Sequence, residues 1–395
     1  MFKIAYWYNN FQASSVLMID DLSDAYIDVY KETYKNDWGY LCNEKGSSFE
    51  FLKYKLLNNF PLIKITFFTP YLRHAVINEN SHFLYKKFAI GERIKFINFL
   101  QFLVSEGHEI AHHGSNHGKY IDNNKLTTIR NWIHEWALFD DIDTGVKVTL
   151  DGVDKFKNEC GINVVGGKYC GYILKDNSQE IIDKCNFLYW CDKPSYTIRD
   201  YSENFFGNNK IISFPTNFPG NAFVRLTYLS GDLQKDKKKK KYKYFQPLYN
   251  LYNYIKLYKL YKNQHIISIQ EHNSPSTTAG IVQSANIVSD IKSLNKIYRF
   301  LSQLSIWYAT CEEIAKYIYI RENSSLFINN EELIIDFENK KNIQNCIISL
   351  ISKNKFILKN YKGEVFLSTF NNKSHVLNLN ISTGKNHYFI VESIE

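Results

Sequence analysis

Between residues 15 and 300 the chain repeatedly alternates a short apolar run with a longer stretch of helical periodicity. The runs are rich in β-branched and aromatic residues and span 15–20, 62–68, 108–112, 162–165, 187–190, 266–272 and 306–309. The helical stretches span 50–58, 91–105, 146–160, 177–185 and 283–304. Strands that alternate with helices build parallel sheets. The sequence therefore predicts an α/β fold on parallel strands, in which a helix ending at Ser105 or Cys160 is followed by a glycine that caps it.

The pattern changes after residue 321. Short apolar runs follow one another with Asn, Lys and Gly turns between them, at 333–337, 346–351, 356–358, 365–367, 375–379 and 388–391. Such spacing is typical of antiparallel strands. We therefore expect two units: a main domain over 1–320, with a Lys/Tyr-rich insertion at about 232–262, and a small antiparallel β appendage over 321–395.

Composition excludes several classes of protein. With 395 residues, of which 45% are hydrophobic, the chain is not disordered throughout. The formal charge of +8 is concentrated in the lysine run 235–243, which we interpret as a solvated loop; residues 248–258 after it have an amphipathic helical pattern suited to core or lid packing. One local basic run without a recognised motif does not indicate nucleic-acid binding. No stretch approaches the roughly 20 apolar residues of a membrane span.

The cysteines and the amino-terminal residues indicate the cellular compartment of the protein. The seven cysteines are odd in number and form no C-x-x-C pair, which is typical of a reduced environment. The first ten residues lack the long apolar region of a secretory signal. We therefore expect a cytoplasmic protein.

Three of the predicted strands end in residues that bind metals or move protons. The run 15–20 ends in Asp20 and Asp21, and the run 266–272 ends in His272. After the run 108–112 come His113 and His117, whose i, i+4 spacing lets two imidazoles reach one ion from a helical turn. Each feature alone is usually structural, but the carboxyl ends of parallel strands meet at one edge, where active sites form.

The types of these residues indicate a chemistry. Two His and one Asp are the ligand set of an open hydrolytic site for a divalent metal. A neighbouring carboxylate and a third His would supply the general base and the general acid. His108 and His112 repeat the i, i+4 spacing but lie in a predicted strand, so we interpret them as structural.

Three segments together resemble motifs of the polysaccharide deacetylase (NodB-like) family. They are Met18-Ile-Asp-Asp21, the stretch from Gly107-His-Glu-Ile to His113-Gly-Ser-Asn-His117, and Ile269-Gln-Glu-His272; residues 306–310 are similar to the closing strand. The resemblance covers about residues 15–320. It implies a distorted (β/α) barrel that removes an N- or O-acetyl group from a sugar, with help from a metal ion.

The resemblance also implies roles for individual residues. Asp21, His113 and His117 would hold the metal, Asp20 would be the base that activates the attacking water, and His272 would be the acid. Zinc suits this ligand set best, and cobalt, nickel, iron or manganese would also be accepted.

The third and fourth motifs of the family are altered in this chain. In Gly167-Lys-Tyr-Cys-Gly-Tyr172, Lys168 stands in for an arginine that positions the catalytic Asp, and Cys170 replaces a proline. A lysine keeps the charge but lacks the planar fork that binds a carboxylate bidentately. We expect Tyr172, Trp190 and Asp192 to line the substrate site, with core packing as the alternative for Trp190 and Asp192. Cys170 and Cys191 are expected not to be ligands.

The sequence thus predicts a metal-dependent carbohydrate deacetylase of glycan or surface-polysaccharide metabolism. Its substrate would be an acetylated sugar or glycan, free or linked to a nucleotide or a lipid. Two alternatives remain open: a hydrolase of a non-sugar linear amide, and an inactive carbohydrate-binding protein that keeps the fold. Lys168 and Cys170 motivate the second, and the complete set of Asp and His residues weighs against it.

Overall fold

The computed structural model describes residues 2–22, 42–79, 82–120, 132–192, 205–225, 244–272, 277–278, 281–282 and 286–394. The lysine run 235–243 lies outside these residues, so the prediction for it stays a prediction. Within the described parts of the chain, no helix combines the length and the apolar character that crossing a bilayer requires.

The centre of the molecule is a curled sheet built around β2 (Ala13–Asp20), whose eight residues are all buried. Its strands follow the order β11-β12-β10-β9-β6-β3-β2-β14-β13, and β17 pairs with the first residues of β2. All these pairings are parallel except that of β11 with β12. The other strands are β3 (Ile65–Thr69), β6 (Glu109–His112), β9 (Gly166–Lys168), β10 (Tyr189–Cys191), β11 (Phe205–Phe206), β12 (Ile211–Ser213), β13 (Phe218–Pro219), β14 (Ile266–His272) and β17 (Ile306–Tyr308). The α/β prediction is confirmed.

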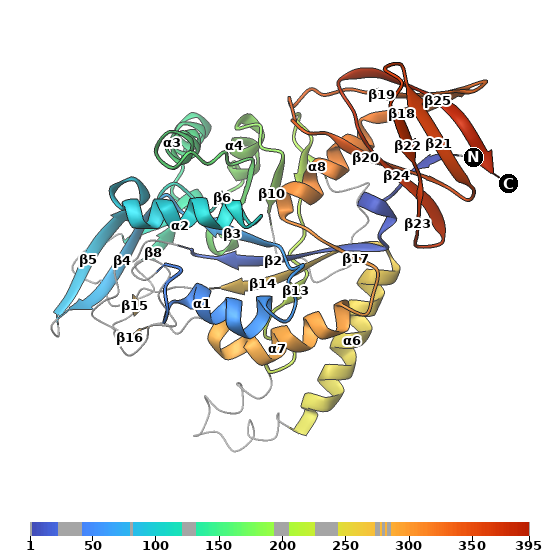
Figure 1. Cartoon of the computed structure of the whole chain (residues 1–395). Helices are drawn as coiled ribbons and strands as arrows, with labels where there is room; N and C mark the ends of the chain where they lie inside the picture. Colours follow the sequence, from blue (N-terminus) through green and yellow to red (C-terminus); the bar gives the residue numbers. More distant parts are fainter. Residues whose placement is uncertain are drawn as a thin grey trace.

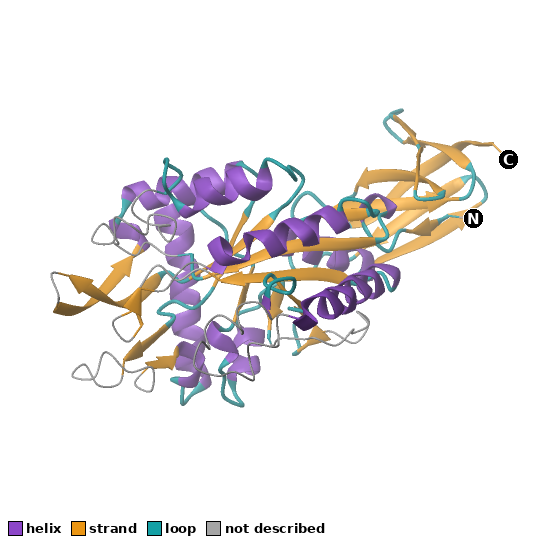
Figure 2. Cartoon of the chain, turned by 90° about the horizontal axis from the view of Figure 1, so that it is seen from below, coloured by secondary structure: helices purple, strands orange, loops and turns teal. Residues whose placement is uncertain are grey.

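Helices cover the outside of this sheet (Figures 1 and 2). They are α1 (Ser48–Leu52), α2 (Ile94–Ser105), α3 (Ile142–Cys160), α4 (Ser178–Lys184), α6 (Gln246–Lys262), α7 (Asn286–Leu301) and α8 (Cys311–Glu322). Local sequence sets their ends. The Asp141 side chain caps the first turn of α3, and Gly161 ends that helix at a φ of +68°, which a glycine adopts without strain. Thr310 and Glu313 form a capping box at the start of α8.

Some expected elements are displaced. Residues 162–165 do not form a strand; the strand in this part of the sheet is β9, which begins at Gly166. The helix predicted over 50–58 is α1 continued by a π-helical turn, Lys53–Leu57. Sequence periodicity also missed the long hairpin of β4 (Leu72–Glu79) and β5 (His82–Ala89), which β15 (Thr277–Thr278) and β16 (Ile281–Val282) extend. The small pair β7 (Gly118–Tyr120) and β8 (Trp132–His134) was missed as well.

The C-terminal residues form two antiparallel sheets, as predicted for the fold of this segment. Their strands are β18 (Ser324–Asn329), β19 (Glu332–Phe337), β20 (Ile347–Ser352), β21 (Lys355–Asn360), β22 (Val365–Leu367), β23 (Thr369–Asn371), β24 (Ser374–Asn380) and β25 (Gly384–Ile394). One sheet has the order β18-β19-β25-β21-β22, and the other has the order β1-β20-β24-β23.

The amino terminus belongs to the second of these sheets. Strand β1 (Lys3–Ile4) pairs antiparallel with β20, and both termini lie beside the C-terminal strands in Figure 1. A short 3-10 helix, η1 (Tyr8–Asn10), then connects β1 to β2. The first residues of the chain therefore pack with the appendage, a pairing that no local pattern reveals. The division into domains at residue 321 stays a prediction.

Candidate active site

The register of the sheet brings the predicted strand ends together. Asp20, the last residue of β2, lies opposite His272 of β14 and Phe68 of β3. In the next pairing Thr69 of β3 lies opposite His112 of β6, so His113 leaves the sheet at the same edge. Because these strands are parallel, residues as far apart in the sequence as Asp20 and His272 meet at one carboxyl edge.

Asp21 occupies the centre of this edge and is almost fully buried, with 3% of its surface exposed. One carboxylate oxygen lies 2.8 Å from Nε2 of His117 and 3.6 Å from Nε2 of His113. The other oxygen lies 2.5 Å from Nε2 of His272. Asp21 has a φ of +64°, an unusual value for a residue with a side chain. This turn allows Asp20 and Asp21 to face the same site.

The segment from His113 to His117 is an irregular loop, and the expected helical turn is wrong. Gly114 and His117 both have positive φ, at +89° and +58°, which a helix does not permit. The loop begins with a hydrogen bond from the His113 amide to the Thr69 carbonyl, at 3.2 Å. The two imidazole rings still lie close together, with their centroids 5.2 Å apart. The conformation of this loop, and not a helical turn, therefore brings the two imidazole rings together.

Glu135 fixes the shape of this loop and was missed by the sequence analysis. Its side-chain oxygens accept hydrogen bonds from the amides of Ser115, at 3.0 Å, and Asn116, at 2.5 Å. Its own amide donates to the His117 carbonyl at 3.3 Å. Burial raises the pKa of Glu135 to about 7, although these backbone hydrogen bonds act in the opposite direction. A lone glutamate beyond the motif carries no signal that would have identified it.

Two further histidines of this region are structural, as predicted. His108 Nδ1 accepts a hydrogen bond from the Ile65 amide at 3.3 Å, and burial lowers the pKa of His108 to about 4. His112 is fully buried, and its Nδ1 accepts from the Gly114 amide at 3.1 Å. The His108 ring therefore supports the backbone at the start of β3, and the His112 ring supports the loop.

Asp20 is paired with Lys168 beside the cluster around Asp21. Nζ of Lys168 lies 2.8 Å from each oxygen of the Asp20 carboxylate, and both residues are buried. Gln270 donates a further hydrogen bond to Asp20 at 3.0 Å, a contact that the sequence analysis did not anticipate. Burial is the largest single influence on the pKa of Lys168 and lowers it. The charge and hydrogen bond of Asp20, together with Tyr172 and Cys191, outweigh burial, so the net shift is upward. Lys168 is thus a buried cation held by Asp20.

Lys168 also contacts His113, one of the candidate metal ligands, through its backbone. Its carbonyl lies 3.1 Å from Nδ1 of His113, which directs Nε2 of that ring toward Asp21. Burial lowers the pKa of His113, which favours the neutral imidazole that a metal requires. A hydrogen bond of this kind orients a ligating ring.

The three residues expected to contact substrate occupy different environments. Tyr172 is half-buried; its ring lies 5.0 Å from Nζ of Lys168, and its hydroxyl donates to Thr216 at 2.7 Å. Asp192 is buried and accepts a hydrogen bond from Ser213 at 2.8 Å. Trp190 is fully buried in an aromatic cluster with Trp136, Tyr169 and Phe187. The position of Trp190 corresponds to the core-packing alternative, because its ring has no exposed surface for a substrate.

Cys170 lies close to the two histidines. Among the described residues, the ligating atoms of His113, His117 and Cys170 lie within 4.8 Å of one another. The Cys170 thiol donates to the His113 carbonyl at 2.9 Å. Cys191 is also fully buried, one strand further along the sheet. Two candidate ligands, a carboxylate and a thiol, therefore flank the same pair of imidazoles.

The donor set fits a divalent transition metal. Two buried imidazoles and a buried carboxylate approach one another with their ligating atoms, and Asp21 Oδ1 and His117 Nε2 are separated by only 2.8 Å. Nitrogen and oxygen donors of this kind are those that zinc and its neighbours accept. His272 is the most open of the group, with 43% of its side chain exposed. The site thus combines an enclosed cluster of candidate metal ligands with an accessible imidazole.

Comparison with known proteins finds similarity in structure. No family model matches the chain, and no curated protein matches it in sequence. It is similar to a polysaccharide deacetylase, so named provisionally, from Mycobacterium smegmatis, at 14% identity and a TM-score of 0.40, over 83% of this chain and 97% of that chain. It is also similar to PuuE allantoinase, at 12% identity and a TM-score of 0.39, over 80% and 92%.

A third solved structure is peptidoglycan deacetylase PdaC from Bacillus subtilis, at 12% identity and a TM-score of 0.33, over 79% of this chain and 94% of that chain. Polysaccharide deacetylases, the family that the sequence motifs resemble, thus recur among the solved structures to which this chain is similar.

Proposed function

We propose that this protein is a metal-dependent hydrolase that removes an acetyl group from an N- or O-acetylated sugar. The observation that carries the proposal is the position of Asp21. Its carboxylate lies among three imidazoles, those of His113, His117 and His272, with the Asp20–Lys168 pair beside it. This arrangement combines a ligand set, a base and an acid at one edge of the sheet.

Asp21, His113 and His117 would hold the ion. When bound, a divalent metal supplies Lewis acidity, which lowers the pKa of water and polarises a carbonyl. Burial lowers the pKa of His113, the Lys168 carbonyl orients its ring, and the Glu135 side chain holds the amides of Ser115 and Asn116. These contacts would preorganise the site before the ion binds.

Asp20 and His272 would move the protons. Lys168 and Gln270 fix the Asp20 carboxylate, which would accept a proton from the attacking water. His272 would donate a proton to the departing nitrogen, because an unprotonated amide nitrogen is a very poor leaving group. The products are acetate and a free amine, or a free hydroxyl when the substrate is an ester. Tyr172, beside Lys168, would contact the sugar.

Acetate release tests this proposal. The purified protein, loaded in turn with zinc, cobalt, nickel, iron and manganese, is supplied with N-acetylglucosamine oligomers, a nucleotide-linked N-acetyl sugar, an acetylated xylan oligomer and a non-sugar acetamide. We expect acetate from at least one of the sugars, lost in Asp20→Asn. Release from the non-sugar amide alone would replace the proposal with the linear-amide alternative. No acetate from any substrate with any metal would contradict hydrolysis.

A further inference from the structure

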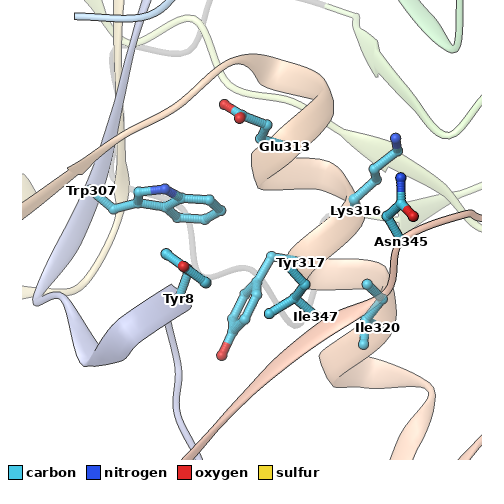
Figure 3. A pocket seen from close by; sticks show the side chains of 8 residues that line it. All are labelled: Tyr8, Trp307, Glu313, Lys316, Tyr317, Ile320, Asn345 and Ile347. Atoms are coloured by element: carbon cyan, nitrogen blue, oxygen red, sulfur yellow. The ribbon is translucent and has the colours of Figure 1, made fainter. Parts of the chain in front are cut away.

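A pocket lies where the central sheet meets the C-terminal strands, with a volume of about 260 Å³. Four elements contribute to it: η1, β17, α8 and the first residue of β20 (Figure 3). Two isoleucines, Ile320 of α8 and Ile347 of β20, provide apolar surface. The pocket therefore joins the amino-terminal segment to residues between 307 and 347.

This pocket is separate from the candidate active site. Trp307, one of its walls, is paired with Ser14 near the start of β2, whereas Asp20 ends the same strand. Six residues of extended strand span about 20 Å. A ligand in this pocket would therefore be held well away from the cluster around Asp21.

Aromatic rings form one side of the pocket. The rings of Tyr8 and Trp307 lie 5.3 Å apart at an angle of 41°, and Tyr317 meets Trp307 edge-on at 5.7 Å and 73°. Tyr8 and Trp307 are only half-buried, so part of each ring is open to the pocket. Figure 3 shows the three rings grouped together. Such a wall offers a flat apolar surface to a ligand of matching shape.

Polar groups line the remaining sides of the pocket. Glu313 and Lys316 project from successive turns of α8, and Asn345 approaches from the strand side (Figure 3). Lys316 pairs with Glu312 at 2.7 Å but keeps 33% of its side chain exposed, and Asn345 is exposed. One acid, one base and one amide supply both donors and acceptors without a strong net charge.

We infer that this pocket binds one ring of a neutral sugar chain. A pyranose has a face of C–H groups that can stack on Trp307 and Tyr8, and a rim of hydroxyls that can bond to Lys316, Glu313 and Asn345. A cationic ligand would favour an aromatic cage without a lysine. The volume of the pocket suits one sugar ring, and the neighbouring sugars of the ligand would extend into solvent. The inference stands on the lining alone and does not require that the protein hydrolyses its ligand.

Binding measurements on the full chain test it. The probes are the β-1,4-linked tetramers of glucose, xylose and N-acetylglucosamine, with tetramethylammonium as a cationic probe. Calorimetry and saturation-transfer NMR measure the binding of each probe. All are measured in a His113→Ala background, which disables the candidate active site. We expect at least one tetramer to bind, with Kd raised about tenfold by Trp307→Ala.

Two exposed positions keep the test independent of folding. Asn345→Ala and Lys316→Met alter the rim without removing core surface, and we expect each to weaken binding severalfold, while Lys340→Met outside the pocket leaves it unchanged. Failure of every tetramer to bind would overturn the inference. So would sugar binding that none of the pocket substitutions weakens, or binding of tetramethylammonium in preference to the sugars. Acetate release by the Trp307→Ala protein reports separately on the proposed hydrolysis.

Discussion

Nζ of Lys168 lies 2.8 Å from both oxygens of Asp20, and the exposed fractions of the two residues are 0% and 4%. The sequence left the positioning of Asp20 open, because a lysine in place of an arginine lacks the planar fork that binds a carboxylate bidentately. The ammonium instead sits between the two oxygens, so one nitrogen contacts the whole carboxylate. The rings of Phe68 and Tyr172 lie 5.2 and 5.0 Å from the same nitrogen and enclose it.

Removal of Lys168 should therefore affect both stability and turnover. Lys168→Met leaves the Asp20 charge buried without its partner, and we expect the free energy of unfolding to fall by about 3–5 kcal/mol. The double variant Lys168→Met with Asp20→Asn should recover much of that loss while remaining inactive. Urea unfolding of the three proteins measures this coupling, and equal stability of Lys168→Met and the wild type would contradict it.

Glu135 should control metal affinity without touching the metal. Glu135→Gln keeps the shape of the side chain but replaces one of the two acceptor oxygens that bind the Ser115 and Asn116 amides. We expect metal affinity to fall about 10–100-fold, as for other residues that orient ligands. Competition with a coloured chelator measures the affinity. Glu180→Gln, on the surface of α4, is the matched control and should bind metal as the wild type does.

Single substitutions can determine whether Asp21 or Cys170 is the third metal ligand. We expect Asp21→Ala to abolish metal binding and Cys170→Ala to retain it, since the Cys170 thiol is already engaged with the His113 carbonyl. The cobalt-loaded protein then lacks the near-ultraviolet charge-transfer band of a thiolate ligand. A band that is present in the wild type and absent from Cys170→Ala would instead place the thiol on the metal.

His272 should matter more for amides than for activated esters. Its side chain is the most exposed of the cluster, at 43%, so removing it should leave the metal ligands in place. We expect His272→Ala to bind metal normally, to lose about 10²–10⁴-fold in kcat on an acetamide and to lose much less on an aryl acetate, whose leaving group needs no proton. Equal losses on both substrates would contradict the role of general acid.

Sequence patterns predicted the part of the site that lies on buried strands. Asp20 and His272 end predicted strands, and parallel strands end at the same edge of a sheet, so their meeting follows from topology. The loop from His113 to His117 was predicted less well, because a spacing of four residues cannot distinguish a helical turn from a loop. Gly114 at positive φ and the distant Glu135 decide between them here.

Other features depend on contacts between distant residues, which no local sequence pattern indicates. The pairing of β1 with β20 joins residues more than 340 positions apart, and the pocket beside Trp307 exists because of it. Trp190 follows a strand pattern that suits a core residue and a site residue equally. Its position was decided by Gly167 on the neighbouring strand, which leaves room for the indole ring to pack against the backbone.

The metal content of the purified protein, measured beside His117→Ala by elemental mass spectrometry, tests the account most directly. We predict about one divalent ion per chain in the wild type, since one cluster of two imidazoles and a carboxylate is present, and its loss in the variant. A wild-type protein that holds no ion, even after incubation with zinc, cobalt, nickel, iron and manganese, would contradict the proposed hydrolase and favour the inactive carbohydrate-binding alternative.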